Sequence, residues 1–320
     1  MPYFLTAPRG DAYENLARDE LVLNELASGE IALYLYVNDR AVIVGRNQNP
    51  YIECDMDKLN ADGVQLVRRI SGGGAVWHDS GNLNYSFIAS DDVYDEKRQL
   101  RVVLSALSGF GIAAEISGRN DLCVNGLKVS GTAVCKRGNN RLQHGTLLIA
   151  AELGALPKYL TPSKLKLEAK GIKSVRARVC NLNELSAEIT VEGMKTALKE
   201  AFEREYGKAE AYPMDGAFAS RLEKLTRERM SRDWRMGESP RYDVEFETRL
   251  SIGSVRLCLN VAGGRIAMCS VYSDCMDDSL PKAVSDVLTG AAFDVKSMTE
   301  ALKPLKGAAE IADWVAGLSI

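Results

Sequence analysis

The chain has 320 residues, of which 46% are hydrophobic and 26% charged, values that are ordinary for a globular protein. Its formal net charge is −3, from 40 basic and 43 acidic residues, which argues against a nucleic-acid-binding protein because such proteins are normally basic. Residues 1–20 lack a basic segment followed by an apolar one, and the most apolar stretch, 31–37, is too short to cross a bilayer. We therefore expect neither a signal peptide nor a membrane span.

The seven cysteines are scattered along the chain, and none forms a C-x-x-C pair. This usage is typical of reduced thiols in a cytoplasmic protein, not of a disulfide framework or a zinc site. The chain has two histidines, His78 and His144, which argues against a metal centre built from histidines. Both lie in glycine-containing stretches that are rich in polar residues.

Up to residue 150, the hydrophobic pattern predicts two helices and five strands, in addition to a hairpin at 121–131. Apolar residues recur at spacings of three and four over 12–30 and 98–111, which is typical of amphipathic helices that end at glycine. A glycine-rich loop is expected to join the third and fourth strands into a pair. The strands are expected at 31–37, 40–47, 64–73, 83–90 and 141–150.

The strongest turn signal is Asn125-Gly126, which separates two apolar runs. This pair suits a type I′ hairpin, in which both central residues adopt a positive φ. Because side chains alternate along a strand, Lys128 is expected on the face opposite Leu127 and Val129.

The chain changes character after the helical segments of 184–232. Short alternating strands with glycine-containing turns are expected over 242–274, and the remainder predicts two helices. We expect a domain boundary and a hinge near Gly237–Pro240. The predicted fold class is α+β, with a large mixed α/β domain over residues 1–237 and a small α+β domain over 238–320.

The stretch RRISGGGAVWHDSGNLNYSF, which starts at Arg68, contains three consecutive glycines between apolar flanks. Glycines are kept where the backbone bends sharply or where another group comes close. One interpretation is a strained hairpin. The other is a concave row of backbone N–H groups for phosphate or carboxylate oxygens, with Arg68 and Arg69 beside it. His78 is either a structural histidine or a ligand contact, and Asn82 and Asn84 are expected on one face of a strand.

Three common signatures are missing or misplaced. The sequence GFGIAA at 109–114 mimics a dinucleotide-binding pattern, but it follows a helix and precedes a strand, the reverse of the required order. Neither a G-x-x-x-x-G-K-[ST] loop nor a G-x-S-x-G elbow occurs. Two common enzyme classes therefore lack their signature.

A second group of polar residues surrounds the predicted hairpin, in RNDLCVNGLKVSGTAV. Asn120 and Asp121 face Lys128 across the paired strands. A lysine after a turn is usually solvated, but apolar residues and Ser130-Gly131 flank this one. The pattern fits either a structural ion pair or a cation–metal–phosphate arrangement.

Four ordered motifs resemble the lipoate–protein ligase family. They are VIVGRNQNPYIEC, then RRISGGGAVWHDSGNLNYSF, then NDLCVNGLKVSGTAV with the later HGTLL, and then KGIKSVRARVCNLNEL. The region from WRMGESPRYDVEFETRL to GSVRLCLNVAGGRI resembles the small C-terminal accessory domain of that family, so the likeness covers nearly the whole chain. One departure is Gln143, where the family often has a second histidine before the HGTLL motif.

The resemblance implies the biotin/lipoate ligase fold and a two-step reaction with ATP and magnesium. The carboxylate of free lipoate attacks the α-phosphate of ATP, which gives lipoyl-AMP and pyrophosphate, and a lysine of an acceptor protein then attacks the mixed anhydride. It implies that Lys128 is catalytic and that Asp121 helps to hold magnesium. It further implies a set of residues that bind lipoate, lipoyl-AMP and ATP: Arg69, Ser71, Gly72, Gly73, Gly74, Ala75, His78, Asn82, Asn84, Asn120, Lys128, Gly131, Thr132 and His144.

The implied acceptors are lipoyl domains of 2-oxoacid dehydrogenase acyltransferase subunits or a glycine-cleavage H protein. We expect a cytoplasmic monomer that binds neither nucleic acid nor membranes. The basic segment 164–178 is either a solvated face or a surface that steers an acidic acceptor towards the site.

Three alternatives stay open at this point. The first is an ATP-independent octanoyl or lipoyl transferase that works through an acyl-cysteine, with Cys123, Cys135 or Cys180 as the nucleophile. The second is a biotin ligase, whose glycine–arginine-rich adenylate loop is absent. The third is an inactive lipoyl-binding module, which the presence of Lys128 and of the glycine loop disfavours.

Overall fold

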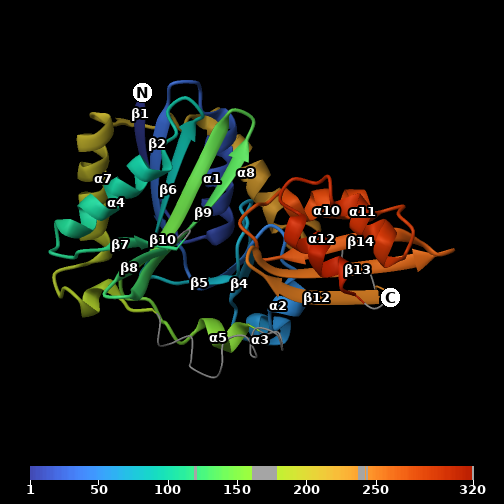
Figure 1. The fold of residues 1–320 in the computed structure, drawn as a ribbon. Coiled ribbons are helices and arrows are strands. Elements are labelled where there is room, and N and C mark those ends of the chain that lie inside the picture. The colour runs from blue at the N-terminus through green and yellow to red at the C-terminus, as the bar shows by residue number, and fades with distance from the viewer. Residues whose placement is uncertain (119–120, 161–178, 237–241, 243, 319–320) are drawn as a thin grey trace.

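The computed structural model describes residues 1–118, 121–160, 179–236, 242 and 244–318. In these residues the chain forms three β-sheets, two in a large unit and one in a small C-terminal unit beside it (Figure 1). The predicted mixed α/β fold with a small C-terminal unit is confirmed. No helix in this part of the chain is long and apolar enough to cross a membrane.

The large unit is built on an eight-stranded sheet. β1 is parallel to β2 and to β11, and the other neighbours are antiparallel. Every residue of the central strand β6 is buried, because helices cover both faces of the sheet. The order is β11 (Glu210–Ala211), β1 (Pro2–Thr6), β2 (Ile31–Val37), β6 (Asn82–Ser90), β10 (Asn140–Leu148), β9 (Leu127–Arg137), β8 (Asp121–Val124) and β7 (Glu115–Ser117).

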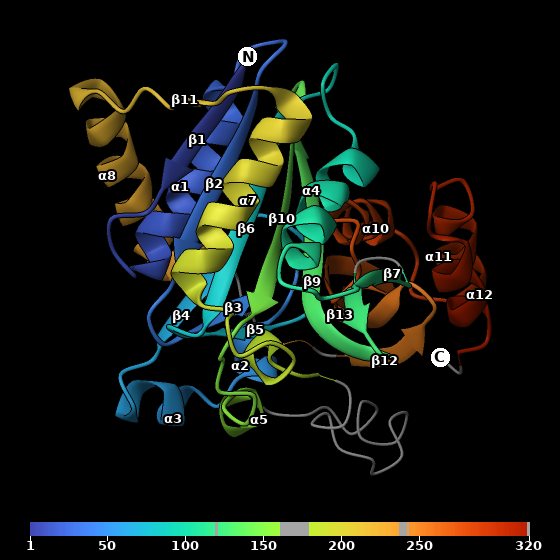
Figure 2. The ribbon, with the colours of Figure 1, turned by 90° about the vertical axis from the view of Figure 1, so that its left-hand side faces the viewer.

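Two helices cover each face of this sheet. Alternation along β2 separates the two apolar cores, since Leu33 and Leu35 pack towards one pair of helices and Tyr34 towards the other. The predicted helix over 12–30 is confirmed but ends earlier, at Glu25. The pairs are α1 (Ala12–Glu25) with α8 (Gly216–Met230), and α4 (Glu96–Ser108) with α7 (Val191–Tyr206), which faces the viewer in Figure 2 and follows the 3₁₀ turn η2 (Leu182–Glu184).

A three-stranded sheet carries the glycine-rich stretch. Its order is β4 (Gln65–Arg68), β3 (Ala41–Val44) and β5 (Val76–His78), with β4 parallel and β5 antiparallel to β3. The short helices α2 (Pro50–Glu53), α3 (Met56–Ala61) and α5 (Leu156–Tyr159) lie below it in Figure 1.

The prediction that the strands before and after the glycine loop form a pair is wrong. β4 lies in the small sheet, whereas β6 lies in the large one. The strand β5 intervenes, and three residues are too few to show the alternation that identifies a strand. The loop therefore connects two strands of the small sheet and lies where the two sheets meet.

The C-terminal unit has its own apolar core under one sheet. The short strands predicted over 242–274 are confirmed as β12 (Val244–Leu250), β13 (Gly253–Ala262) and β14 (Arg265–Ser273). The prediction of two helices is wrong, because the described residues contain α10 (Leu280–Leu288), α11 (Val295–Leu302) and α12 (Ala309–Ala316). Gly290 and Gly307, with φ of 88° and 84°, separate them.

The predicted type I′ hairpin is confirmed between β8 and β9. Asn125 has a φ of 51° and Gly126 a φ of 76°. The large unit ends with α9 (Arg232–Met236). Three predicted features lie outside the described residues: Asn120, the basic segment 164–178 and the hinge at Gly237–Pro240.

Candidate functional site

The side chain of Arg69 stabilises the glycine-rich loop through hydrogen bonds to its backbone. This side chain is buried, and its guanidinium group donates to the carbonyl oxygens of Gly72 (2.7 Å), Gly74 (2.8 Å) and Ile43 (3.2 Å). Its Nε also donates to the hydroxyl oxygen of Ser71 at 3.1 Å. One side chain therefore fixes the curvature of the loop.

Arg68 braces the neighbouring backbone in the same way. It donates to carbonyl oxygens of the segment 45–48 and, on its other side, to those of Trp234 and Arg235 in α9. Burial lowers the pKa of both Arg68 and Arg69 to about 10, so both stay charged at neutral pH. Carbonyl oxygens accept from these guanidinium groups in this structure, and contact of Arg69 with a ligand stays a prediction.

Ser71 and His144, both predicted site residues, lie together beneath the loop. The Ser71 hydroxyl is 2.6 Å from Nε2 of His144, and Nδ1 of His144 is 3.3 Å from a carboxylate oxygen of Asp19. The hydroxyl of Tyr36 donates to the same Asp19 oxygen at 3.2 Å. All four side chains are buried. Sequence reasoning missed Asp19, for which the one available signal was an acidic residue among the apolar residues of the predicted helix.

His78 stands at the end of β5 and is buried. Its Nδ1 lies 2.9 Å from Nδ2 of Asn38, whereas its Nε2 has no hydrogen-bond partner among the described residues. Burial, with Arg69 and His144 nearby, lowers the pKa of His78 to about 3. His78 is therefore neutral at physiological pH, and contact of its Nε2 with a ligand stays a prediction.

The predicted pair Asn82 and Asn84 is buried at the start of β6. Nδ2 of Asn84 donates to the carbonyl oxygen of Tyr36 at 3.3 Å, and Nδ2 of Asn82 donates to Oδ1 of Asn84 at 3.4 Å. Oδ1 of Asn82 has no partner among the described residues. These amides combine a structural role with capacity left to bind a ligand.

The low pKa of His78 makes stability depend on pH. The folded state has the lower pKa, so the contribution of His78 is complete above the unfolded pKa of about 6.5 and is lost as the pH falls towards 3. Between pH 7 and pH 5, we expect the wild-type protein to lose about 2 kcal/mol more unfolding free energy than His78→Gln loses. Urea unfolding of both proteins at the two pH values measures this difference. Equal losses would contradict the assignment of a neutral buried histidine.

Lys128 folds back over Gly131 to reach Asp121. Its Nζ lies 2.7 Å from Oδ1 of Asp121, and both side chains are about one-third exposed, at 37% and 33%. A Cβ on Gly131 would lie 3.0 Å from the Lys128 Nζ, so glycine leaves the room that this conformation needs. The sequence left open whether Lys128 and Asp121 form an ion pair. The structure contains this ion pair, and it is accessible to solvent.

The Lys128–Asp121 pair and His144 are near neighbours on the large sheet. His144 lies opposite Ala133, and Gly131, two residues away, lies opposite Asp121. With strands about 4.8 Å apart and about 3.3 Å per residue, the Cα atoms of Asp121 and His144 are roughly 12 Å apart. Thr132, also predicted, lies between them on β9, opposite Gly145.

A turn of the C-terminal unit lies directly on the glycine loop. The N–H of Gly73 donates to the carbonyl oxygen of Cys275 at 2.9 Å. A Cβ on Gly72 would lie 2.5 Å from that oxygen and 2.9 Å from the carbonyl oxygen of Met276. The glycines thus permit a close approach of backbone to backbone, and the φ of 91° at Gly73 favours glycine as well.

A cleft of about 340 Å³ separates the two units, lined by Arg46, Arg68 and Trp234 on one side and by Tyr272 on the other. The Trp234 ring lies between two guanidinium groups, those of Arg46 at 4.5 Å and Arg229 at 3.9 Å from the ring centroid. No residue predicted to bind lipoate or ATP lines this cleft. Sequence reasoning did not find it.

Two further features bear on the kind of catalysis: the state of the cysteine thiols and the grouping of side chains that could bind a metal ion. All seven cysteines are free and buried, and burial raises the pKa of Cys180 and raises that of Cys135 to about 12. An activated thiolate requires the opposite shift. Within the described ranges, no three acidic, histidine or cysteine side chains are grouped to hold a metal ion.

Two known protein families match most of the chain between them. Residues 11–203 match the lipoyl protein ligase A/B catalytic domain, and residues 239–314 match the bacterial lipoate protein ligase C-terminus. The lipoate-protein ligase A of Psychrobacter cryohalolentis is 39% identical over 290 residues, which are 88% of this chain and 85% of that protein.

Solved structures show the same fold. P. falciparum LipL1 in complex with lipoate has a TM-score of 0.88 and 29% identity, and covers 99% of this chain and 100% of its own. The bipartite ligase of Thermoplasma acidophilum, determined as part of a lipoylation system with its E2 lipoyl domain, has a TM-score of 0.67 and 28% identity over 76% of this chain and 99% of its own. A lipoate-protein ligase A bound with ATP has a TM-score of 0.64 and 26% identity over 74% and 98%.

Proposed function

The chain belongs to the lipoate–protein ligase A family, and we propose that it activates free lipoate with ATP and transfers the lipoyl group to a lysine of an acceptor lipoyl domain. In the first step a lipoate carboxylate oxygen bonds to the α-phosphorus of ATP and pyrophosphate leaves. In the second step the acceptor amine attacks the carbonyl carbon of lipoyl-AMP. An amide forms, and AMP and a proton leave.

The observation that carries this proposal is the solvent-accessible Lys128–Asp121 pair on the same sheet as His144, with the Cα atoms of Asp121 and His144 roughly 12 Å apart. Both steps gather negative charge on the phosphate and acyl oxygens, so each needs a preorganised cation. A lysine ammonium is a compact charge on a flexible stem, suited to a single oxygen. Lys128 would leave Asp121 for the ligand and stabilise that charge in both steps.

The glycine loop supplies the remaining contacts of this proposal. Backbone N–H groups of Gly72, Gly73 and Gly74 would donate to phosphate or acyl oxygens where side chains would clash. The Gly73 N–H donates to a carbonyl oxygen of the C-terminal unit in this structure, and it would exchange that partner for the ligand. The other members of the proposed binding set are Arg69, Ser71, Ala75, His78, Asn82, Asn84, Gly131, Thr132, His144 and, from the sequence resemblance, Asn120.

Magnesium would enter this site with ATP. Asp121 is the carboxylate available next to Lys128, and Mg²⁺ commonly takes one or two protein carboxylates together with phosphate oxygens and waters. A single carboxylate therefore fits a magnesium ion held mainly by the triphosphate. Bound there, the ion would neutralise phosphate charge, while Lys128 and the loop position the α-phosphate.

We propose a lipoyl domain as the acceptor because of a relative: the bipartite ligase of Thermoplasma acidophilum was studied structurally together with its E2 lipoyl domain. The test is to incubate the protein with lipoate, Mg-ATP and a purified lipoyl domain. We expect the acceptor to gain one lipoyl mass only when ATP is present. Acceptor that stays unmodified while lipoyl-AMP accumulates would reject this acceptor and leave the adenylation step standing.

The buried thiols lead to a prediction that separates the ligase from an acyl-cysteine transferase. Replacing Cys123, Cys135 and Cys180 together with alanine should keep ligation within about tenfold of wild type in protein that folds, because all three thiols are buried and the burial of Cys135 and Cys180 opposes thiolate formation. Acceptor modification and intact-mass spectra measure the outcome. An acyl-thioester on the wild-type chain, together with loss of activity in one single-cysteine variant, would contradict the ligase mechanism.

A shortened chain that ends after Met236 is expected to separate the two steps. The C-terminal unit has its own core, and the cut keeps α9, whose carbonyl oxygens accept from Arg68. We expect adenylation within about tenfold of the full chain and a larger loss of transfer, because the removed unit acts on acceptor access. Pyrophosphate release and acceptor modification are measured separately. A folded short chain without adenylation would contradict this division of roles.

A further inference from the structure

Helix α1 carries two buried polar side chains that lead to the two histidines of the chain. Asn15 and Asp19 are four residues apart, so they lie one turn apart on the same helix face, and each is 1% exposed. Asn15 reaches His78 through Asn38, and Asp19 contacts His144 directly. We propose that α1 fixes where each imidazole carries its proton, with the proton of His78 on Nε2 and that of His144 on Nδ1. The inference rests on the proposed function only for its consequence in catalysis.

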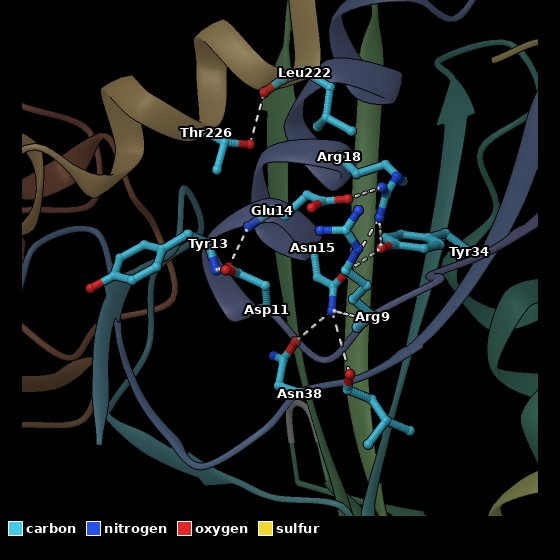
Figure 3. Close-up of polar contacts among 11 residues, drawn as sticks. Arg9, Asp11, Tyr13, Glu14, Asn15, Arg18, Tyr34, Asn38, Leu222 and Thr226 are labelled. Atoms are coloured by element: carbon cyan, nitrogen blue, oxygen red, sulfur yellow. Dashed lines mark hydrogen bonds and ion pairs between the residues drawn. The ribbon is translucent and has the colours of Figure 1, made fainter. Parts of the chain in front are cut away.

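The orientation of the Asn15 amide follows from its neighbours (Figure 3). Its Nδ2 donates to the carbonyl oxygen of Arg9 at 3.1 Å and to Oδ1 of Asn38 at 2.9 Å. Its Oδ1 accepts from the Arg18 guanidinium at 3.2 Å and from the Tyr34 hydroxyl at 3.0 Å. Because a guanidinium group can only donate and a carbonyl oxygen can only accept, the amide has one possible orientation.

This orientation passes along the chain of hydrogen bonds to His78. Since Oδ1 of Asn38 accepts from Asn15, its Nδ2 must face His78, where it lies 2.9 Å from Nδ1. That nitrogen is then an acceptor, and a neutral imidazole carries its proton on the other nitrogen. The low pKa of His78 keeps the ring neutral. His78 therefore presents an N–H donor that has no partner among the described residues.

His144 carries its proton on Nδ1, whereas His78 carries its proton on Nε2. The Asp19 carboxylate can only accept, so Nδ1 of His144 carries the proton at their 3.3 Å contact. Nε2 then accepts from the Ser71 hydroxyl at 2.6 Å. Arg69 Nε donates to the same hydroxyl oxygen at 3.1 Å, which is compatible with a hydroxyl that donates to the histidine. All donors and acceptors in this set agree.

Asn15, Asn38 and Asp19 are thus positioning residues, not catalytic ones. They present a neutral donor at His78 and a fixed Ser71 oxygen beside the glycine loop, where the adenylate would form. If the His78 proton moved from Nε2 to Nδ1, Nε2 would carry a lone pair where a ligand oxygen needs a hydrogen-bond donor. Such a loss of one preorganised donor typically slows the chemical step by about 10²-fold or more.

The test uses ¹⁵N NMR of the full-length, ligand-free protein, because its two histidines give four imidazole nitrogen signals and protonated and bare nitrogens differ widely in chemical shift. Asn38→Asp keeps the acceptor for Asn15 and turns the donor at His78 into an acceptor, so the His78 proton should move from Nε2 to Nδ1. Asp19→Ala removes the acceptor at His144, which should lose its Nδ1 proton in favour of Nε2. Glu25→Gln is the matched control: it changes a carboxylate at the exposed end of α1 that pairs with Arg221, and should alter neither spectrum nor rates.

Pyrophosphate release is then measured on the same proteins. In folded Asn38→Asp, the shifted His78 proton should accompany about a 10²-fold slower adenylation. An unchanged His78 pattern in Asn38→Asp, or an unchanged His144 pattern in Asp19→Ala, would overturn the assignment to α1. Moved protons with wild-type rates would overturn the catalytic consequence. A wild-type protein that forms no lipoyl-AMP would reject the proposed function but leave the spectral result intact.

Discussion

Lys128→Ala is expected to slow lipoate-dependent pyrophosphate release by about 10²–10³-fold, the usual effect of removing one preorganised contact to developing charge. Transfer from pre-formed lipoyl-AMP should slow as well, because the same ammonium serves both steps. The fold should remain intact, since an ion pair with both side chains one-third exposed contributes about 0–1 kcal/mol to stability. Each half-reaction is measured separately, and circular dichroism checks the fold.

Lys136→Ala is the matched control for this experiment. Lys136 lies on the same strand, β9, and pairs with Asp91 at the surface, so its removal should leave both half-reactions at wild-type rates. Lys128→Arg should recover little activity, because the wide planar guanidinium does not replace a compact ammonium folded over Gly131. A folded Lys128→Ala with near wild-type rates in both steps would reject Lys128 as the catalytic residue.

Arg69→Lys is expected to destabilise the protein by about 3 kcal/mol, because a lysine cannot reach the several carbonyl oxygens that the guanidinium group binds. The carbonyl oxygens of Gly72, Gly74 and Ile43 would compete for fewer donors in a buried setting, and the glycine loop would lose its brace. Adenylation should fall at the same time, by about 10²-fold, since the loop positions the reacting groups. Urea unfolding and pyrophosphate release measure the two effects.

Arg141→Lys provides the comparison for Arg69→Lys. Arg141 makes one ion pair with Asp91 at the surface, so the same replacement should change stability by less than about 1 kcal/mol and leave activity unchanged. If Arg69→Lys kept wild-type stability while adenylation fell, Arg69 would act on the ligand directly, as the sequence alone led us to expect, and not as a brace.

The predictions that succeeded rest on local signals. Asn125-Gly126 identifies its turn because the backbone conformation at both positions favours these residues, and the hairpin then fixes where Lys128 lies. The strands of the C-terminal unit follow from alternation over seven to ten residues. Ser71 and His144, 73 positions apart, were grouped by resemblance to a family, and in the structure the Ser71 hydroxyl lies 2.6 Å from Nε2 of His144.

The features that the sequence did not reveal depend on contacts between distant elements. Asp19 is one acidic residue on a helix, and its contact with His144 appears when α1 packs on the large sheet. From the sequence alone, the Arg69 guanidinium could bind either a ligand or a backbone carbonyl oxygen. The geometry of the loop shows that it donates to carbonyl oxygens. The approach of Cys275 to Gly73 joins residues 202 positions apart in two units. No local pattern encodes such a contact.

The most direct test is pyrophosphate release from the purified wild-type protein with lipoate and Mg-ATP, in the absence of any acceptor. We expect release that depends on lipoate, with one lipoyl-AMP formed per pyrophosphate, and no acyl group bound to the chain. Absence of pyrophosphate and lipoyl-AMP, together with ATP-independent transfer of an octanoyl or lipoyl group through a thioester, would contradict the ligase assignment.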